Sequence, residues 1–282
     1  KKISSVVGAA TTVKKKVFEN RPVASAGDAL QGQVAGLQVF TSSGEPTAQV
    51  SMRLRGVNSI NASNTPLFVL DGSPVSSSIF TTLNSNDIEN ITVLKDASAT
   101  AIYGSRAANG VVYITTKKGT SERPVIKMSA QYGISEVAGN PVDMCNSAQY
   151  FQLREMIDPA LKFNKDFQDL KEFRLKNNIG IDWRDWILNE SAPTVSADLS
   201  ISGRTQKTDY YVSLGFFDQT GIEPNSFMTR YSVRSNLNSK LTDWLKIGIN
   251  LALTYQESRT QGYTTGNSWY NPMSIADWNL PY

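Results

Sequence analysis

The spacing of hydrophobic positions changes near residue 119. Before that point, short apolar runs separated by turn residues predict a small mixed α/β unit. Its expected strands are Leu37–Thr41, Val50–Val57, Pro66–Leu70, Ile88–Leu94 and Gly110–Thr116. Its expected helices are Asp28–Gln33, with Asp28 as N-cap, and Ala97–Tyr103, stopped by Gly104.

After Gly119, five segments alternate apolar and polar residues with period 2, which is typical of strands that have one apolar face. They are Val125–Ile134, Thr194–Gly203, Tyr210–Phe217, Tyr231–Leu241 and Trp244–Tyr255. A soluble β-sandwich also alternates in this way, so alternation alone leaves a sandwich and a membrane barrel both open.

Three further features favour a membrane barrel. The segments match the roughly 9–11 residues that a tilted strand needs to cross the hydrocarbon layer. The predicted turns Gln206–Thr208 and Thr242–Asp243 are tight, whereas the connection over residues 135–193 is long, as in outer-membrane barrels. Aromatic residues gather near segment ends, as an interfacial girdle requires: Tyr210, Tyr211, Phe216, Phe217, Tyr231, Trp244 and Tyr255.

Composition removes several function classes. The chain has no histidine and one cysteine, Cys145, which excludes Ser–His–Asp and Cys–His catalysis, His-ligated zinc and intramolecular disulfides within it. No catalytic residue, metal site or cofactor is therefore predicted. The net charge is only +3, and the run Lys14–Lys16 is not extended into a basic face, so no nucleic-acid partner is expected. No run of about 20 apolar residues predicts a transmembrane helix.

The long connection has two notable segments. Ser147–Ile157 has helical spacing, and Ile181–Ile187 is amphipathic and aromatic-rich. Such a segment either folds over its own loop or contacts a partner or ligand, since aromatic residues are favoured at interfaces. The residues assigned to the second alternative are Asp182, Trp183, Asp185 and Trp186. Nothing gives Asp182, Asp185 and Glu190 the facing geometry that glycoside chemistry needs.

Four ordered motifs in the first half resemble the SusC/RagA-type family of TonB-dependent transporters. They are Ala29–Val39, Arg53–Ser63, Pro66–Val75 and Asn86–Val112, and the similarity continues through Tyr210–Phe217. The resemblance implies an α+β plug domain over residues 1–120. It implies that residues 121–282 form the first antiparallel transmembrane β-strands and the first long extracellular loop of a barrel of about 22 strands.

By resemblance, the parent protein imports a bulky oligosaccharide or peptide across the outer membrane of a Gram-negative bacterium. The implied partners are TonB, a SusD-like surface lipoprotein that acts as a lid, the substrate and outer-membrane lipid. Lys1–Val13 is no signal peptide, no TonB-binding box is visible, and Asn279–Tyr282 forms no closing strand. We therefore expect this chain to be cut at both ends, with TonB binding through a box that it lacks.

Arg53, Arg55 and Arg106 suit a role in locking the plug to carboxylates of the barrel wall. The alternative is that they are ordinary surface arginines, worth under about 1 kcal/mol each. Two other function classes also stay open: a surface polysaccharide-binding or adhesion protein without transport, and a secreted carbohydrate-active enzyme. The enzyme is disfavoured because histidine and a convincing acid–base pair are both missing.

Overall fold

The fold is described from a computed structural model, which covers residues 10–15, 17, 25–41, 45–46, 50–56, 64–95, 101–137, 145–180, 187–189 and 191–260. The chain divides into two compact units. The first contains Lys1–Ile134, Pro193–Thr220 and Ser226–Thr260, and the second contains Ser135–Ala192, Gly221–Asn225 and Gln261–Tyr282.

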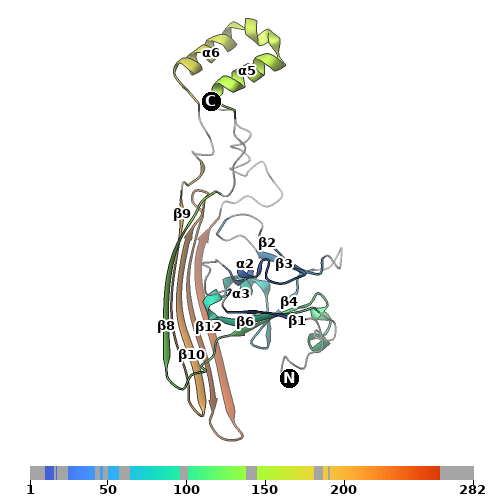
Figure 1. The fold of residues 1–282 in the computed structure, drawn as a ribbon, viewed down its shortest axis with the longest axis vertical. Coiled ribbons are helices and arrows are strands. Elements are labelled where there is room, and N and C mark those ends of the chain that lie inside the picture. The colour runs from blue at the N-terminus through green and yellow to red at the C-terminus, as the bar shows by residue number, and fades with distance from the viewer. Residues whose placement is uncertain are drawn as a thin grey trace. The chain divides into compact units, whose positions relative to one another are not determined.

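A mixed sheet of five strands, in the order β1-β6-β7-β4-β5, forms the centre of the N-terminal region, here called the plug (Figure 1). Its strands are β1 Ala10–Lys14, β4 Leu67–Leu70, β5 Ser73–Val75, β6 Ile88–Leu94 and β7 Val111–Thr116. Strands β4 and β7 are parallel, and the other pairs are antiparallel. A separate hairpin pairs β2 Leu37–Thr41 with β3 Val50–Leu54. The short helices are α2 Ala26–Leu30, α3 Ser77–Thr82, η2 Ser85–Asp87 and η3 Ala101–Ala107.

The plug has an apolar core under this sheet. Ile88, Ile91, Val93 and Ile114 are fully buried, as is Leu30 of α2. The rings of Phe68 in β4 and Phe80 in α3 stack with centroids 4.9 Å apart. Burying each such side chain contributes about 1.5–3 kcal/mol, so the core is the main source of stability for this region.

Five long strands form an antiparallel meander in the order β12-β11-β10-β9-β8, here called the wall (Figure 1). They are β8 Val125–Ser135, β9 Ala192–Arg204, β10 Thr208–Thr220, β11 Phe227–Lys240 and β12 Lys246–Arg259. All five alternating segments are therefore confirmed as strands. Most ends extend by one to four residues beyond the predicted bounds, but β11 ends one residue before the predicted Leu241 and β12 begins two residues after the predicted Trp244. The tight turns between β9 and β10 and between β11 and β12 are confirmed as well.

Several predictions for the plug need correction. Helix α2 begins two residues earlier than expected, so Asp28 lies inside the helix and is not its N-cap. The buried residues Ala26, Ala29 and Leu30 share one helical face, and this tertiary contact decides the helix position. Strand β3 ends at Leu54, before the predicted Val57, because Arg55 and Gly56 have positive φ angles of 61° and 88°.

The predicted helix over Ala97–Tyr103 lies partly outside the described residues. Its described part belongs to a 3-10 segment, η3, that continues to Ala107. Gly104, with φ 67° and ψ −155°, is non-helical and separates two helical turns within this segment, so the predicted stop at Gly104 is confirmed. The lysine run is also more structured than a tail, because Lys14 ends strand β1 and Lys15 forms an ion pair with Glu89 at 3.3 Å.

The second unit contains a pair of helices between β8 and β9. The predicted helix Ser147–Ile157 is confirmed as α5, and it begins with a capping box between Asn146 and Gln149. A 3-10 turn, η4 Pro159–Phe163, leads to α6 Lys165–Lys176. Lys171 of α6 donates to Glu155 of α5 at 2.6 Å, and this hydrogen bond lowers the pKa of the Glu155 carboxyl.

Candidate plug–wall interface

The two faces of the wall strands differ sharply in polarity. The face toward the plug, here called the inner face, is polar and buried: Ser213, Arg230, Arg234 and Asn236 are all at most 5% exposed. The opposite, outer face is apolar and open. Its exposed side chains include Leu199, Leu214, Tyr231, Val233, Leu251, Leu253 and Tyr255. A soluble sandwich would bury the apolar face, so this distribution favours strands whose outer face lies in lipid.

The girdle prediction is wrong for two members of the aromatic set and stays a prediction for the others. Phe216, Tyr231 and Tyr255 are cross-strand neighbours with ring centroids 5.3 and 6.4 Å apart, on the outer face. Tyr211 and Phe217 are buried on the inner face instead. Successive side chains of a strand point to opposite faces, so Tyr211 and Phe217 lie on the other face from Tyr210 and Phe216. Tyr211 and Phe217 therefore cannot belong to an interfacial girdle on the outer face.

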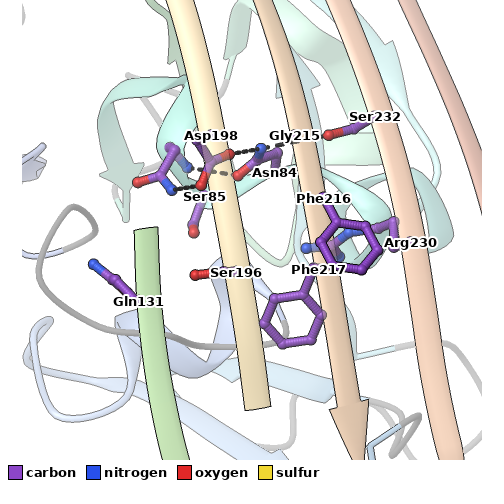
Figure 2. Close-up of a pocket in the computed structure, with 11 residues that line it drawn as sticks. Asn84, Ser85, Gln131, Ser196, Asp198, Gly215, Phe216, Phe217, Arg230 and Ser232 are labelled. Atoms are coloured by element: carbon purple, nitrogen blue, oxygen red, sulfur yellow. Dashed lines mark hydrogen bonds between the residues drawn. The ribbon is translucent and has the colours of Figure 1, made fainter. Parts of the chain in front are cut away.

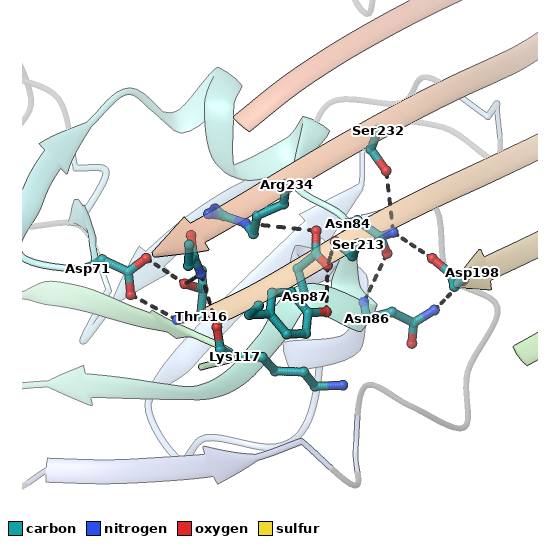
Figure 3. Close-up of polar contacts among 12 residues, drawn as sticks. Asp71, Asn84, Asn86, Asp87, Thr116, Lys117, Asp198, Ser213, Ser232 and Arg234 are labelled. Carbon is teal, nitrogen blue, oxygen red and sulfur yellow. Dashed lines mark hydrogen bonds and ion pairs between the residues drawn. The ribbon is translucent and has the colours of Figure 1, made fainter. Parts of the chain in front are cut away.

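A short polar turn of the plug, η2, reaches the inner face just before strand β6 begins. The side chain of Asn84 caps this turn by accepting a hydrogen bond from the backbone N–H of Asn86 at 2.9 Å. The cap fixes the turn so that Asn84, Asn86 and Asp87 all project to the wall (Figure 3). The turn therefore presents two amides and one carboxylate to the inner face.

Asp87 is the most deeply buried member of this group, with 3% of its surface exposed. Its carboxylate accepts hydrogen bonds from Tyr211 Oη at 2.9 Å and Ser213 Oγ at 2.5 Å, and it lies 3.8 Å from Arg234 Nε. Burial raises the pKa of the Asp87 carboxyl above its usual range, although Ser213, Arg234 and Tyr211 favour the ionised form. The ion pair is too long to offset the desolvation of the carboxylate.

Asp198 of β9 is the matching acceptor on the wall. Its two carboxylate oxygens accept hydrogen bonds from Asn84 Nδ2 and Asn86 Nδ2, each at 2.6 Å. Asn84 fits here because β10 has Gly215 at the contact, where any Cβ would clash with the Asn84 amide. The cavity beside these residues holds only about 10 Å³, room for about one water molecule (Figure 2). The plug and wall are thus closely fitted at this point.

A third contact joins the end of β7 to the wall. Thr116 donates through its backbone N and its Oγ1 to the carboxylate of Asp71, at 2.9 and 2.6 Å. Asn236 of β11 donates to Thr116 Oγ1 and to the carbonyl of Lys117, both at 2.9 Å. Asp71 adopts a positive φ of 48° in the turn between β4 and β5, so a turn residue also supports this contact.

Together these contacts form what we call the latch. On the plug it comprises Asp71, Asn84, Asn86, Asp87, Thr116 and the Lys117 carbonyl; on the wall it comprises Asp198, Tyr211, Ser213, Ser232, Arg234 and Asn236. Within the described residues, Arg234 Nε and Nη2 and Asn236 Oδ1 are buried without a hydrogen-bond partner. The latch is therefore incompletely satisfied, which lowers its net stability.

The arginines predicted to lock the plug lie elsewhere on it. Arg53, Arg55 and Arg106 are exposed, and Arg53 lies over the ring of Phe40 at 5.7 Å. Within the described residues, Arg53 and Arg106 form no ion pair with the wall strands. Their pairing with other barrel carboxylates stays a prediction. Asp182, Trp183, Asp185 and Trp186 lie outside the described residues.

Sequence reasoning missed most of the latch. Asn86 and Asp87 were noted only as part of a family motif, and Asn84, Asp198, Ser213, Arg234 and Asn236 were not singled out. The one available signal was the polar run from Asn84 to Asp87 directly before a buried strand.

Among the described residues, no group of three or more acidic or cysteine side chains could hold a metal ion. No helix in the same part of the chain has the length and apolar character to cross a membrane.

Comparison with known proteins gives the same picture. Residues 2–111 match the family described as TonB-dependent Receptor Plug Domain. The chain is 38% identical over 269 residues to TonB-dependent receptor P26 of Formosa agariphila, covering 92% of the chain and 26% of P26. It is 33% identical over 261 residues to TonB-dependent receptor SusC of Bacteroides thetaiotaomicron, covering 88% of the chain and 24% of SusC.

Among solved structures, the RagAB peptide transporter aligns with a TM-score of 0.82 and 38% identity. The alignment covers 92% of this chain and 32% of the RagAB chain. The chain belongs to the SusC/RagA-type TonB-dependent receptors. It spans about a quarter of the length of the curated relatives named above. The predicted fold class of this SusC/RagA-type receptor, an α+β plug domain followed by antiparallel strands, is confirmed. The predicted domain boundary at residue 120 stays a prediction.

Proposed function

We propose that the whole protein is a TonB-dependent importer of a bulky nutrient in the outer membrane of a Gram-negative bacterium. In this proposal, residues 1–120 gate the pore and the strands that follow form one part of its wall. The observation that carries the proposal is the latch, a buried polar contact between an apolar-cored plug and the inner face of strands whose outer face is apolar.

The chemistry of the latch suits a gate. A polar contact that opens to water exchanges its protein hydrogen bonds for hydrogen bonds to water, so each bond contributes only about 0.5–1.5 kcal/mol net, and bonds to charged groups about 1.5–3 kcal/mol. An apolar interface would lose its full burial energy on opening. The plug can thus seal firmly and still separate from the wall under an external force.

We propose that energised TonB supplies this force through an N-terminal box, and that a SusD-like surface lipoprotein closes the outer opening. The cargo is a glycan or a peptide. Support for a peptide comes from RagAB, a relative whose structure is described as a peptide transporter. Support for a glycan comes only from the family resemblance.

The second unit, which contains helices α5 and α6, is our candidate for contact with the SusD-like lid or the cargo. Its apolar side chains Met156, Ile157 and Phe163 are 75%, 70% and 90% exposed. We extend this role to Asp182, Trp183, Asp185 and Trp186 in the same connection. We also propose that Arg53, Arg55 and Arg106 pair with carboxylates of the remaining barrel wall in the whole protein.

Gene disruption in the native host tests the proposal. Growth of the disrupted and intact strains is compared on defined peptide mixtures and on oligosaccharides as sole nutrient sources, with and without TonB. We expect one nutrient class to require both the gene and TonB. Surface binding of that nutrient with no gene-dependent or TonB-dependent uptake would instead support an adhesion or polysaccharide-binding protein.

A further inference from the structure

A pocket of about 250 Å³ lies at the tight-turn end of the wall. Its lining residues come from the turn between β9 and β10 and from the ends of β11 and β12. Four of them are cations and one is an acid: Arg204, Lys207, Lys240, Lys246 and Asp209. The pocket is therefore strongly basic, and none of the latch residues lines it.

The cations are placed close together by strand register. Lys240 of β11 and Lys246 of β12 are directly opposite each other, and the Lys240 backbone N–H donates to the carbonyl of Lys207 at 2.7 Å. Like charges directly opposite on paired strands destabilise a sheet. Within the described part of the chain, none of the pocket's cations forms an ion pair. Asp209 is already engaged, because it accepts a hydrogen bond from Asn238 Nδ2 at 2.8 Å.

The positive charge continues along the inner face of β11. Alternation puts Met228, Arg230, Ser232, Arg234, Asn236, Asn238 and Lys240 on that face, so it carries three cations and no carboxylate. Arg234 lies about 20 Å from Lys240 along the strand at about 3.3 Å per residue. The carboxylate that faces Arg234 from the plug is Asp87, at 3.8 Å. When the plug moves away, that counter-charge leaves with it.

We propose that the pocket is an anion-binding site for cargo leaving the pore, and that the imported nutrient carries carboxylate or sulfate groups. This inference rests on the proposed import function and narrows its substrate class. Cationic clefts concentrate anions and speed their capture. The inner-face position favours cargo over a lipid headgroup, since lipid meets the outer face.

Binding to the purified full-length receptor in nanodiscs tests the site without transport. The probes are hexagalacturonate and the neutral hexamer maltohexaose, measured by calorimetry at low and high salt. We expect hexagalacturonate to bind more tightly, and added salt to weaken it. Lys240→Gln with Lys246→Gln should lower hexagalacturonate affinity about twofold to thirtyfold, because two exposed ion pairs of about 0.2–1 kcal/mol each are lost.

Two matched variants control for charge. Lys240→Arg with Lys246→Arg should keep the affinity, and Lys14→Gln with Lys118→Gln, two exposed plug lysines outside the pocket, should not change it. Unchanged hexagalacturonate binding in the Lys240/Lys246 glutamine variant overturns the site. The cargo assignment is overturned if the glutamine variant keeps its hexagalacturonate affinity but no longer co-purifies with phosphatidylglycerol, because the pocket would then bind a lipid headgroup. Binding needs no TonB, so either result is distinguishable from the finding that no nutrient shows gene-dependent and TonB-dependent uptake, which would overturn the import function instead.

Discussion

Alternate residues of strands β9, β10 and β11 form an inner and an outer face, and the two faces differ in which side chains are buried. Polar side chains are buried on the inner face, whereas apolar side chains are exposed on the outer face. Leu214 of β10 is 49% exposed on the outer face, whereas its neighbour Ser213 is 5% exposed on the inner face. In water the leucine would be buried and the serine exposed. The reversal is explained when each face has its own surroundings, with lipid outside and the polar latch inside.

This comparison teaches that burial alone does not indicate a permanent contact. The plug core buries Ile91 and Ile114 among apolar neighbours, and separating them would expose hydrocarbon to water. The latch buries Asp87 and Arg234 among polar partners, several of them incompletely satisfied. We therefore expect the plug core to persist under conditions that release the latch from the inner face.

The largest expected effect comes from removing the latch carboxylate. Asp87→Ala leaves the Tyr211 and Ser213 hydroxyls buried without their acceptor and Arg234 without its counter-charge, which should destabilise the plug–wall contact by about 3–5 kcal/mol. Hydrogen exchange of the segment around η2 and β10 in the full-length receptor, followed across a urea series, measures this loss. The paired variant Asp87→Leu with Arg234→Met should recover only the part that comes from the buried charge, because Tyr211 and Ser213 still lose their acceptor. A loss below about 1 kcal/mol in the single variant contradicts the role of Asp87 in the latch.

The outer face gives the next effect. Leu214→Arg, in the middle of β10, should reduce the free energy of folding into a bilayer by about 2–4 kcal/mol if the side chain lies near the midplane. Leu241→Arg at the tight turn is the matched control and should cost about 0–1 kcal/mol. Urea-dependent folding into lipid vesicles measures both. Equal costs would place the outer face out of the membrane.

A smaller effect is expected from one amide of the latch. Asn86→Ala removes the hydrogen bond to Asp198 Oδ2 and should weaken the plug–wall contact by about 1.5–3 kcal/mol, because the acceptor is charged. Asn250→Ala on the exposed β12 serves as control, with an expected change within about 0.5 kcal/mol. The same urea series detects both, and equal responses would remove Asn86 from the latch.

The smallest effect is a pH dependence. Because burial raises the Asp87 pKa above its ordinary 3.8, the closed state binds this proton more readily than the released state. The contribution of Asp87 to plug–wall stability is thus fully present below pH 3.8, falls as pH rises through the raised pKa, and is constant above it. Asp87→Asn should abolish this part of the pH profile. A profile that rises over the same window would mean that the pKa is lowered.

The sequence predicted the strands well because period-2 alternation is a local signal. All five wall strands and most plug strands were located to within a few residues, and helix α5 was found with the bounds that the structure shows. Strand β1 was missed, since a short segment ending in Lys14 resembles a charged tail until its pairing with β6 is known. Helix α6 was missed as well, because its few apolar positions, Phe167, Leu170, Phe173 and Leu175, stand among many charged residues.

The latch could not be predicted in the same way. Its contacts join residues more than a hundred positions apart, such as Asn84 with Asp198 and Asp87 with Ser213. Polar residues on alternate strand positions look alike in the sequence, whether they face water, a pore or a plug. Gly215 illustrates the limit, because its lack of a side chain has a reason only once Asn84 is seen beside it.

The most direct test of the central claim, that the latch must open during transport, is a reversible disulfide across it. Asp87 and Ser213 make side-chain contact, so Asp87→Cys with Ser213→Cys in a Cys145→Ser background offers a cross-link between plug and wall. Uptake of the gene-dependent nutrient is measured in the same cells before and after reduction. We expect the oxidised receptor to take up no nutrient and dithiothreitol to restore uptake. Full uptake by a completely cross-linked receptor would contradict this expectation.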